Sequence, residues 1–391
     1  MRIVDIRERS IDLSRFADLS IHQSLLTTSI VAVVTDVLRN GIPIVGYGFG
    51  SVGRFAQSGL IRERFAPRLL AADTDQLSNS ANDNIDPFRA WKLMMSDEKA
   101  GGHGERCVAV GALDMAIWDA AAKIEDAPLF SFLAETLGNN SEPGTQINCY
   151  AAGGYPYPIE DHSSLRTEIR LIVDRGFTHA KIKIGKREIS EDLQRIDIAA
   201  KELPNGYSSL AVDAMNAYSH ESAIQAATAL SVKELWWFED ICDPLDFDTQ
   251  SDIAENYAPP VAAGEALFSL SEAKLLERHG GLRPNHDILV FDPVHCYGLP
   301  VYLEIVDHYV KHGWSKKSFW PHGGHQFCQH VVAALGLGGA EVNLTSFQPL
   351  CGLADDTVVV DGRISMSDRA GIGFEHRNAV RQLFHSLLET G

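Results

Sequence analysis

The sequence predicts an α/β fold in which a TIM-like barrel follows an α+β amino-terminal segment. From about residue 145, short apolar runs alternate with helical stretches at a spacing of roughly 30 residues, as the βα units of a barrel do. Three of these runs end in an acid, and the acids are evenly spaced, since 239 − 213 and 265 − 239 are both 26. Residues 1–140 place strands first and helices afterwards, which is an α+β order.

The amino-terminal segment is expected to begin with three strands. Asn40-Gly41 is a turn signal between the second and the third. The strands are expected at about 3–6, 29–34 and 43–48. Helical periodicity then follows at 60–72, 86–95 and 106–136, and a break rich in Gly, Asn and Pro covers 138–144.

Eight barrel strands are expected after this break. They lie at 146–151, 179–184, 209–213, 235–239, 261–265, 287–292, 318–321 and 341–346. Beyond 351 the chain is rich in turn residues, and it ends in a short amphipathic helix that carries Val380, Leu383 and Leu387.

The acids at the strand ends predict a metal site. Active sites of barrels lie at the carboxyl ends of the strands, where Asp213, Glu239 and Glu265 follow the third, fourth and fifth strands. Neighbouring strands are about 4.8 Å apart, so the three carboxylates can converge on one cation. Oxygen ligands favour Mg²⁺ over Zn²⁺. We therefore expect one Mg²⁺ per subunit.

Candidate acid and base residues flank these acids. Lys181 and Lys183 point the same way from the second strand, and their mutual repulsion is expected to lower the pKa of one of them. Asp292 and His322 end the sixth and seventh strands and can form a carboxylate–imidazole pair. Lys183 and His322 would then face a bound acid from opposite sides, which suits removal of a proton beside a carboxylate.

Other interpretations of the same residues are simpler. A single acid after a strand is usually a helix cap, and a Lys-x-Lys pair alone is usually an exposed alternation. The run from His322 to His330 contains three histidines, but its spacing matches no standard zinc helix. His325 is expected to be structural, and His103 and Arg106 are expected to brace the long helix.

Composition limits the partners of the protein. A net charge of −18 argues against nucleic acid, because no basic stripe could offset it. No apolar stretch is long enough to span a membrane, and the charged start does not resemble a signal peptide. The six cysteines form no CxxC pair, which predicts a reducing, cytoplasmic setting. We expect a small-molecule hydroxy acid as partner, and a homo-oligomer because barrels of this size often assemble.

The pattern of Lys-x-Lys, three spaced acids and an Asp/His pair resembles the mandelate racemase subgroup of the enolase superfamily. The resemblance implies a capping domain over 1–140, a (β/α)₇β barrel over 145–355 and a tail over 356–391 that returns to the cap. It also implies that the three acids bind Mg²⁺, that Lys183, Lys181 and the His322–Asp292 dyad do acid–base chemistry, and that Glu341 meets the substrate.

Within the subgroup, three stretches resemble the D-tartrate dehydratases. They are Gly46-Tyr-Gly-Phe49 leading to Gly53-Arg54, Glu98-Lys99 with Gly101-Gly-His-Gly-Glu-Arg106, and Pro321-His-Gly-Gly-His-Gln326. The resemblance implies that Lys99 reaches a substrate carboxylate and that Arg54 lies in a closing loop. Two positions depart from the family pattern: Met215 stands where Asn is usual, with Asn216 one place later, and Ala266 replaces another Asn.

We therefore expect Mg²⁺-dependent dehydration of a hydroxy diacid or acid sugar, with D-tartrate to oxaloacetate as the first expectation. One alternative is dehydration of another acid sugar, and another is racemisation at the α-carbon. A third, from a different class, is a barrel that binds an acid without catalysis.

Overall fold

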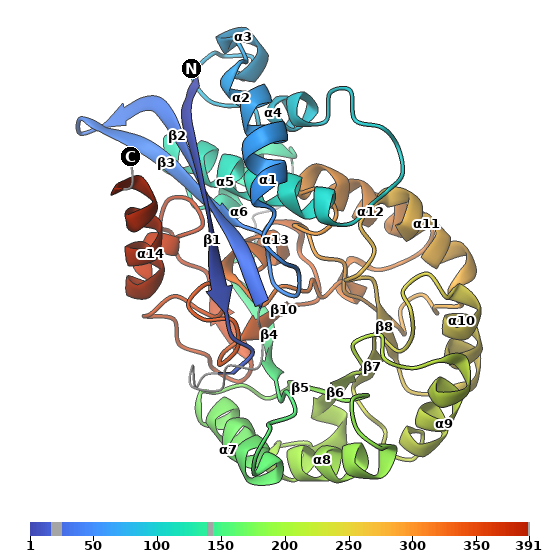
Figure 1. The fold of residues 1–391 in the computed structure, drawn as a ribbon. Coiled ribbons are helices and arrows are strands. Elements are labelled where there is room, and N and C mark those ends of the chain that lie inside the picture. The colour runs from blue at the N-terminus through green and yellow to red at the C-terminus, as the bar shows by residue number, and fades with distance from the viewer. Residues whose placement is uncertain (17–25, 139–143, 390–391) are drawn as a thin grey trace.

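The computed structural model describes residues 1–16, 26–138 and 144–389 (Figure 1). An antiparallel sheet runs in the order β1 (Ile3–Leu13), β2 (Leu26–Arg39), β3 (Ile42–Phe49). The predicted turn joins β2 to β3, with positive φ at both Asn40 and Gly41. The three predicted strands are confirmed, and each is longer than its predicted range.

Helices follow this sheet in the predicted order. They are α1 (Ser58–Leu60), the π-helical turn η1 (Ile61–Phe65), α2 (Ala66–Leu70), α3 (Thr74–Leu77), α4 (Pro87–Met94), α5 (Glu105–Ile124) and α6 (Leu129–Thr136). The expected helix at 106–136 is thus two helices, because Pro128 begins α6. Helix α5 lies so close to β3 that a Cβ on Gly46 would be 1.9 Å from the Ala116 carbonyl oxygen.

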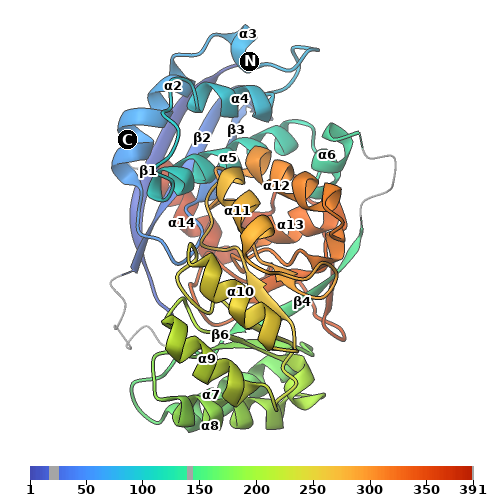
Figure 2. The same cartoon turned by 90° about the vertical axis from the view of Figure 1, so that its right-hand side faces the viewer.

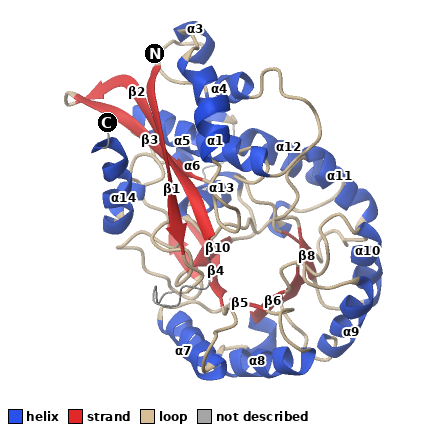
Figure 3. Ribbon diagram, in the orientation of Figure 1, coloured by secondary structure: helices blue, strands red, loops and turns tan. Residues whose placement is uncertain are grey.

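Seven parallel strands curl into the barrel. They are β4 (Gln146–Gly153), β5 (Ala180–Lys183), β6 (Leu210–Asp213), β7 (Trp237–Glu239), β8 (Val261–Ala263), β9 (Ile288–Leu289) and β10 (Ala340–Asn343), and β10 pairs with β4. The TIM-like architecture expected from the sequence is confirmed. Figure 3 shows the strands inside a ring of helices.

The prediction of a strand over 318–321 is wrong in its extent, because the structure has only a single bridging residue there. Residues Lys316–Ser318 form a 3-10 turn (η3), and only Phe319 makes a parallel bridge, to Leu289 of β9. The Trp320 amide donates to the Leu289 carbonyl at 2.9 Å, and Gly338 donates to Phe319 at 3.0 Å. Pro321 has no N–H, so the ladder cannot continue as a full strand.

The ring of helices covers the outside of the barrel (Figures 1 and 2). It consists of α7 (Asp161–Asp174), α8 (Ile189–Glu202), α9 (His220–Leu230), α10 (Phe247–Asn256), α11 (Leu270–His279), α12 (Leu299–Lys311) and α13 (Gln326–Leu335), with a 3-10 turn η2 (Gly206–Ser209) after α8. Inside the barrel, Tyr150 and Trp237 pack with small strand residues and close the floor below the polar site.

The carboxyl-terminal segment contacts both parts of the fold. Strand β11 (Arg363–Ser365) pairs antiparallel with β4, the 3-10 turn η4 (Phe374–His376) follows, and α14 (Asn378–Glu389) lies against β1 and β2. The Phe384 ring stacks on Tyr47 of β3 with centroids 4.6 Å apart. The boundaries at 140, 145 and 355 stay predictions, and the break at 139–143 lies outside the described residues.

Two features bear on the expected setting. All six cysteines are buried and free. Among the described residues, no helix combines the length and apolar character that crossing a bilayer requires.

Candidate active site

Three carboxylates meet at the carboxyl ends of neighbouring strands. Asp213 and Glu239 are the last residues of β6 and β7, and Glu265 follows β8. One ligand oxygen from each lies within 4.8 Å of the other two. Asp213 and Glu239 are buried, whereas the Glu265 side chain is 21% exposed. The sequence spacing therefore brings these acids together as expected.

Both lysines of β5 form ion pairs with these acids. Lys183 pairs with Asp213, and Lys181 pairs with Glu239. The Lys181 ammonium also lies 3.0 Å from Glu341 Oε2 and 3.7 Å from Asp213 Oδ2. Strands β5, β6 and β7 pair in register, which sets Lys183 opposite Asp213 and Asp213 opposite Glu239. The lysines thus face carboxylates and not each other.

The expectation that repulsion lowers the pKa of one lysine is wrong for this arrangement. Burial by itself lowers the pKa of Lys183, but attraction by Asp213 outweighs it and the net pKa is raised. Burial acts in the same way on Lys181, where Glu239 and Glu341 raise the pKa well above its usual range. A carboxylate at contact distance outweighs a second ammonium group further away.

The acids also perturb each other. Burial, followed by repulsion from Asp213 and Glu265 against the attraction of Lys181, raises the pKa of Glu239 to about 7. The Trp237 indole Nε1–H donates to Glu239 Oε2 at 2.6 Å, and the Tyr150 hydroxyl donates to Glu341 at 3.0 Å. The sequence analysis assigned neither aromatic residue a polar contact, because an apolar strand pattern does not show which ring carries a donor to a buried acid.

The predicted Asp/His pair forms on the other side of the carboxylates. His322 Nδ1 lies 2.9 Å from Asp292 Oδ2, and His322 Nε2 lies 3.5 Å from Glu265 Oε2. Burial opposes charge on His322, but attraction by Glu265 and the hydrogen bond to Asp292 raise its pKa to about 9. The imidazole is therefore protonated at neutral pH, and Nδ1–H donates to Asp292.

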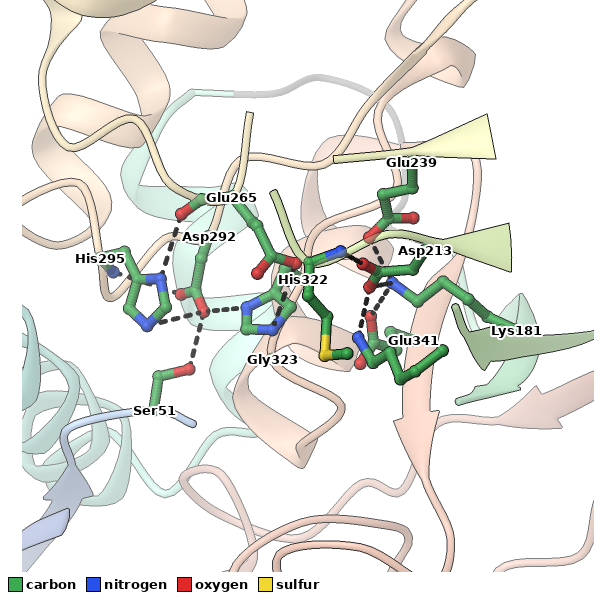
Figure 4. Close-up of polar contacts among 12 residues, drawn as sticks. Ser51, Lys181, Asp213, Glu239, Glu265, Asp292, His295, His322, Gly323 and Glu341 are labelled. Carbon is green, nitrogen blue, oxygen red and sulfur yellow. Dashed lines mark hydrogen bonds and ion pairs between the residues drawn. The ribbon is translucent and has the colours of Figure 1, made fainter. Parts of the chain in front are cut away.

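Two residues for which the sequence analysis expected no role, Ser51 and His295, lie against Asp292 (Figure 4). The Ser51 hydroxyl donates to Asp292 Oδ2 at 2.7 Å, and its oxygen lies 3.2 Å from His325 Nε2. His295 Nε2 lies 3.7 Å from the same Asp292 oxygen. Ser51 comes directly after Gly50 and the Gly46–Phe49 motif, and its place beside this motif could have marked it as a candidate site residue. Nothing in the sequence, however, links Ser51 to Asp292 in the loop after β9.

The expected substrate-binding residues lie in different surroundings. The Arg54 guanidinium is half-buried and sits 4.6 Å above the Phe268 ring, beside the site. Glu341 is buried beneath Lys181. Lys99 is exposed, and within the described residues its ammonium group makes no hydrogen bond or ion pair. The structure therefore brings Glu341 and Arg54 to the site and leaves Lys99 in the cap.

The two departures from the family pattern have local consequences. The Met215 amide donates to Asp213 Oδ1 at 2.8 Å, so the backbone still holds this acid. The Asn216 side chain donates instead to the Cys242 carbonyl at 2.8 Å. Ala266 is buried and brings no donor. Met215 and Ala266 thus provide no side-chain amide next to the carboxylates, as the sequence predicted.

The bracing roles expected for the histidine- and glycine-rich stretches fit their contacts. Arg106 Nε donates to the Tyr297 hydroxyl at 2.8 Å, and His103 Nδ1 lies 3.2 Å from the same oxygen. Burial lowers the pKa of His325 to about 4, as expected for a neutral structural imidazole. Neither His325 nor His330 belongs to a metal-compatible group in the described part of the chain.

The carboxylate group fits a hard divalent cation. All three donors are oxygen atoms, and Glu265 Oε2 is a buried atom with no hydrogen-bond donor among the described residues. Mutual repulsion between the acids disfavours their ionised forms, and a cation would relieve it. Asp213, Glu239 and Glu265 are therefore the residues that could hold Mg²⁺.

Comparisons with known proteins agree with this geometry. Residues 164–380 match the family described as enolase C-terminal domain-like. The L-talarate/galactarate dehydratase of Salmonella typhimurium is 27% identical over 368 residues, which cover 92% of this chain and 84% of that protein. A racemase from Streptomyces coelicolor with bound magnesium superposes with a TM-score of 0.75 at 21% identity, over 98% of this chain and 99% of that one. The L-talarate dehydratase of a Polaromonas species, complexed with Mg and L-glucarate, gives 0.71 at 24% identity, over 95% and 94%.

Proposed function

Because the chain belongs to the enolase superfamily, through its enolase C-terminal domain-like region, we propose that it is a Mg²⁺-dependent dehydratase of a hydroxy acid. One observation carries the proposal: three convergent carboxylates lie between a lysine at one end and the Asp292-paired His322 at the other. The similarity to an L-talarate/galactarate dehydratase supports an acid sugar or related diacid as the substrate class.

The residues divide the reaction between them. Asp213, Glu239 and Glu265 would hold one Mg²⁺ per subunit. When bound, Mg²⁺ supplies positive charge that offsets the negative charge developing on the substrate. The same positive charge weakens the attraction of Asp213 for the proton on Lys183. Lys183 Nζ takes the α-proton, and Lys181 keeps the buried Glu341 and Glu239 neutralised.

His322 completes the elimination. The electron pair of the broken Cα–H bond forms the carbon–carbon double bond as the Cβ–O bond breaks. His322 gives its Nε2 proton to the departing hydroxyl, which leaves as water, and the enol product tautomerises to a keto acid. Asp292 orients the imidazole and keeps it protonated, consistent with the raised pKa of His322.

For the substrate itself we propose D-tartrate, which would give oxaloacetate. The motifs around Arg54, Lys99 and His322 support it through their resemblance to D-tartrate dehydratases. A six-carbon diacid is the second candidate, favoured by the 27% identity to the L-talarate/galactarate dehydratase. A panel of D-tartrate, L-tartrate, galactarate, talarate and arabinonate, assayed for keto-acid formation with Mg²⁺, separates the two.

The assignment of acid and base is tested by isotope exchange. In D₂O, Lys183→Ala should lose both dehydration and exchange of the α-proton, with kcat about 10²–10⁴-fold lower. His322→Asn should lose dehydration but keep α-proton exchange. Lys201→Ala, an exposed lysine on α8, serves as the control. Undiminished turnover in Lys183→Ala would exclude the mechanism, and inverted, labelled substrate without keto acid would instead identify a racemase.

We further propose a cytoplasmic setting and a homo-oligomeric state. Six free, buried thiols suit a reducing compartment. Light scattering on the purified protein measures the number of subunits directly.

A further inference from the structure

A group of metal-compatible side chains that is separate from the active site lies on the outside of the barrel. Glu277 is near the end of α11, His308 is in the last turn of α12, and His312 follows that helix directly. One ligand atom from each lies within 4.8 Å of the other two. Helices α11 and α12 are neighbours in the ring, as Figure 2 shows.

A backbone hydrogen bond fixes the ring of His312. Its Nδ1 lies 2.7 Å from the backbone carbonyl of His308, so Nδ1–H donates there. The lone pair of the ring is then on Nε2, which stays available. Histidine ligands of metals typically donate their other ring N–H to a carbonyl or carboxylate in this way, because it fixes the tautomer and the ring orientation.

His308 offers an unsatisfied nitrogen to the same point. Its Nε2 is buried and has no hydrogen-bond partner among the described residues, and it lies 3.6 Å from Glu277 Oε2. The centroids of the His308 and His312 rings are 4.2 Å apart. Zn²⁺ would bind this nitrogen in the neutral form of the ring.

We propose that Glu277, His308 and His312 form a second metal site that binds one Zn²⁺ ion. Two imidazoles and one carboxylate suit Zn²⁺, whereas Mg²⁺ prefers oxygen ligands. Three protein ligands leave one position for water, and the exposed side of His312 gives solvent access. The ion would join the end of α11 to the end of α12.

This site is separate from the proposed catalytic centre. Helix α11 begins soon after Glu265, and α12 begins soon after His295, so both start at the end of the barrel that holds the carboxylates. Each then runs back by about 15–20 Å, at roughly 1.5 Å per residue. The cluster therefore lies toward the opposite end of the barrel, and the inference does not depend on the proposed reaction.

One charge opposes the binding of a cation. Lys274 lies on α11 three residues before Glu277, so it is a neighbour of that residue on the helix surface. Its positive charge would repel Zn²⁺. Replacing Lys274 by Gln should therefore increase the affinity for Zn²⁺. The test then includes one variant that binds more tightly as well as variants that bind more weakly.

The test measures Zn²⁺ binding to the whole chain with Mg²⁺ in excess, so that the carboxylate centre is occupied. Calorimetry against a competing chelator gives the stoichiometry and affinity. We expect one Zn²⁺ per chain, and His308→Gln and His312→Gln should each weaken it by at least about 100-fold, beyond the 10–100-fold that loss of a supporting partner costs. His279→Gln, an exposed histidine at the end of α11, is the matched control.

Two further measurements show whether Zn²⁺ binds at the proposed site or at the catalytic carboxylates. Asp213→Asn should leave the Zn²⁺ stoichiometry unchanged, and Co²⁺ should give the intense visible absorption of a tetrahedral site that His312→Gln abolishes. Equal binding in both histidine variants and the wild type would overturn the inference. So would loss of binding in Asp213→Asn alone, which would place the ion at the catalytic carboxylates, or an equal loss in His279→Gln.

Discussion

At the scale of single residues, Asp292 is the point where several parts of the chain meet. It accepts hydrogen bonds from the Val294 amide at 2.7 Å, from Ser51 at 2.7 Å and from His322 at 2.9 Å. Burial alone raises the pKa of Asp292, but the neighbouring His295 and the other histidines lower it far more. The carboxylate thus stays ionised and holds His322 in one tautomer.

Ser51 should act as a positioning residue for this dyad. Ser51→Ala removes one donor from a buried carboxylate, and such hydrogen bonds contribute about 1.5–3 kcal/mol. We expect kcat to fall about 10-fold or more, with a smaller change in KM, because Ser51 bonds Asp292 and would act on His322 through it. Steady-state kinetics check this.

Ser58→Ala is the matched control for that experiment. The Ser58 hydroxyl donates to Glu8 at 2.6 Å within the cap, away from the dyad. A similar loss of kcat in both variants would indicate a general loss of stability and contradict a specific role for Ser51.

His330 should make stability depend on pH. Its Nδ1 accepts from the Phe130 amide at 3.1 Å and its Nε2–H donates to the Ile372 carbonyl at 3.1 Å, so the neutral ring is satisfied. Burial lowers its pKa to about 4. The unfolded chain takes up this proton near pH 6.5 and the folded chain does not. The stabilisation is therefore complete above pH 6.5 and is lost, by up to about 3 kcal/mol, as the pH falls to 4.

Urea unfolding of the wild type and of His330→Gln across pH 4–7 measures this contribution. The variant should lose less stability than the wild type over the window, because glutamine does not titrate. Parallel curves for the two proteins would contradict the assignment. The exposed His385→Gln should follow the wild type.

At the scale of elements, close backbone contacts hold the cap on the barrel. Helix α5 approaches the loop after β9, and a Cβ on Gly111 would lie 1.9 Å from the Val294 carbonyl oxygen. The amide of the same Val294 donates to Asp292. A glycine in the middle of a helix is costly by itself, so here its value is the close approach.

Gly111→Ala should therefore destabilise the protein and disturb the dyad. Overpacking of this kind costs about 1–3 kcal/mol. Gly59→Ala is the matched control, because a Cβ at this helical glycine meets nothing within 4 Å. Denaturant midpoints of the two variants check the prediction, and an equal effect in both would contradict the role of the contact.

At the scale of the whole molecule, the end of the chain supports its beginning. Arg9 of β1 donates to the Ser386 hydroxyl of α14 at 2.7 Å, and Phe384 packs on Tyr47 and Phe374. Figure 1 shows α14 beside β1, with both termini on the same side of the cap. The amino-terminal sheet is thus covered by a helix that lies far from it along the sequence.

Phe384→Ala should loosen this junction. Removing a buried aromatic ring costs about 3–5 kcal/mol. We expect a lower urea midpoint than in His385→Ala, which changes the neighbouring exposed side chain. A midpoint equal to that of the control would mean that α14 does not support the sheet.

Much of the fold and part of the site could be predicted from the sequence. The even spacing of Asp213, Glu239 and Glu265 reflects a repeated βα unit, so local periodicity was enough to place the acids on adjacent strands. The partner of Asp292 in the cap could not be found in this way, because Ser51 is 241 residues away along the chain. The predicted extent of the strand around Phe319 was also wrong. It was based on apolar content, which takes no account of the N–H that Pro321 lacks.

The sequence by itself determined the barrel, its order of strands and the identity of the polar groups at their ends, because these follow from short-range periodicity and residue chemistry. Only the tertiary structure decided which of those groups are charged. The lysines of β5 have raised pKa values because carboxylates from β6 and β7 contact them, and His322 is protonated because Glu265 and Asp292 flank it. Charge states depend on distances in space and on burial, and both are properties of the folded chain.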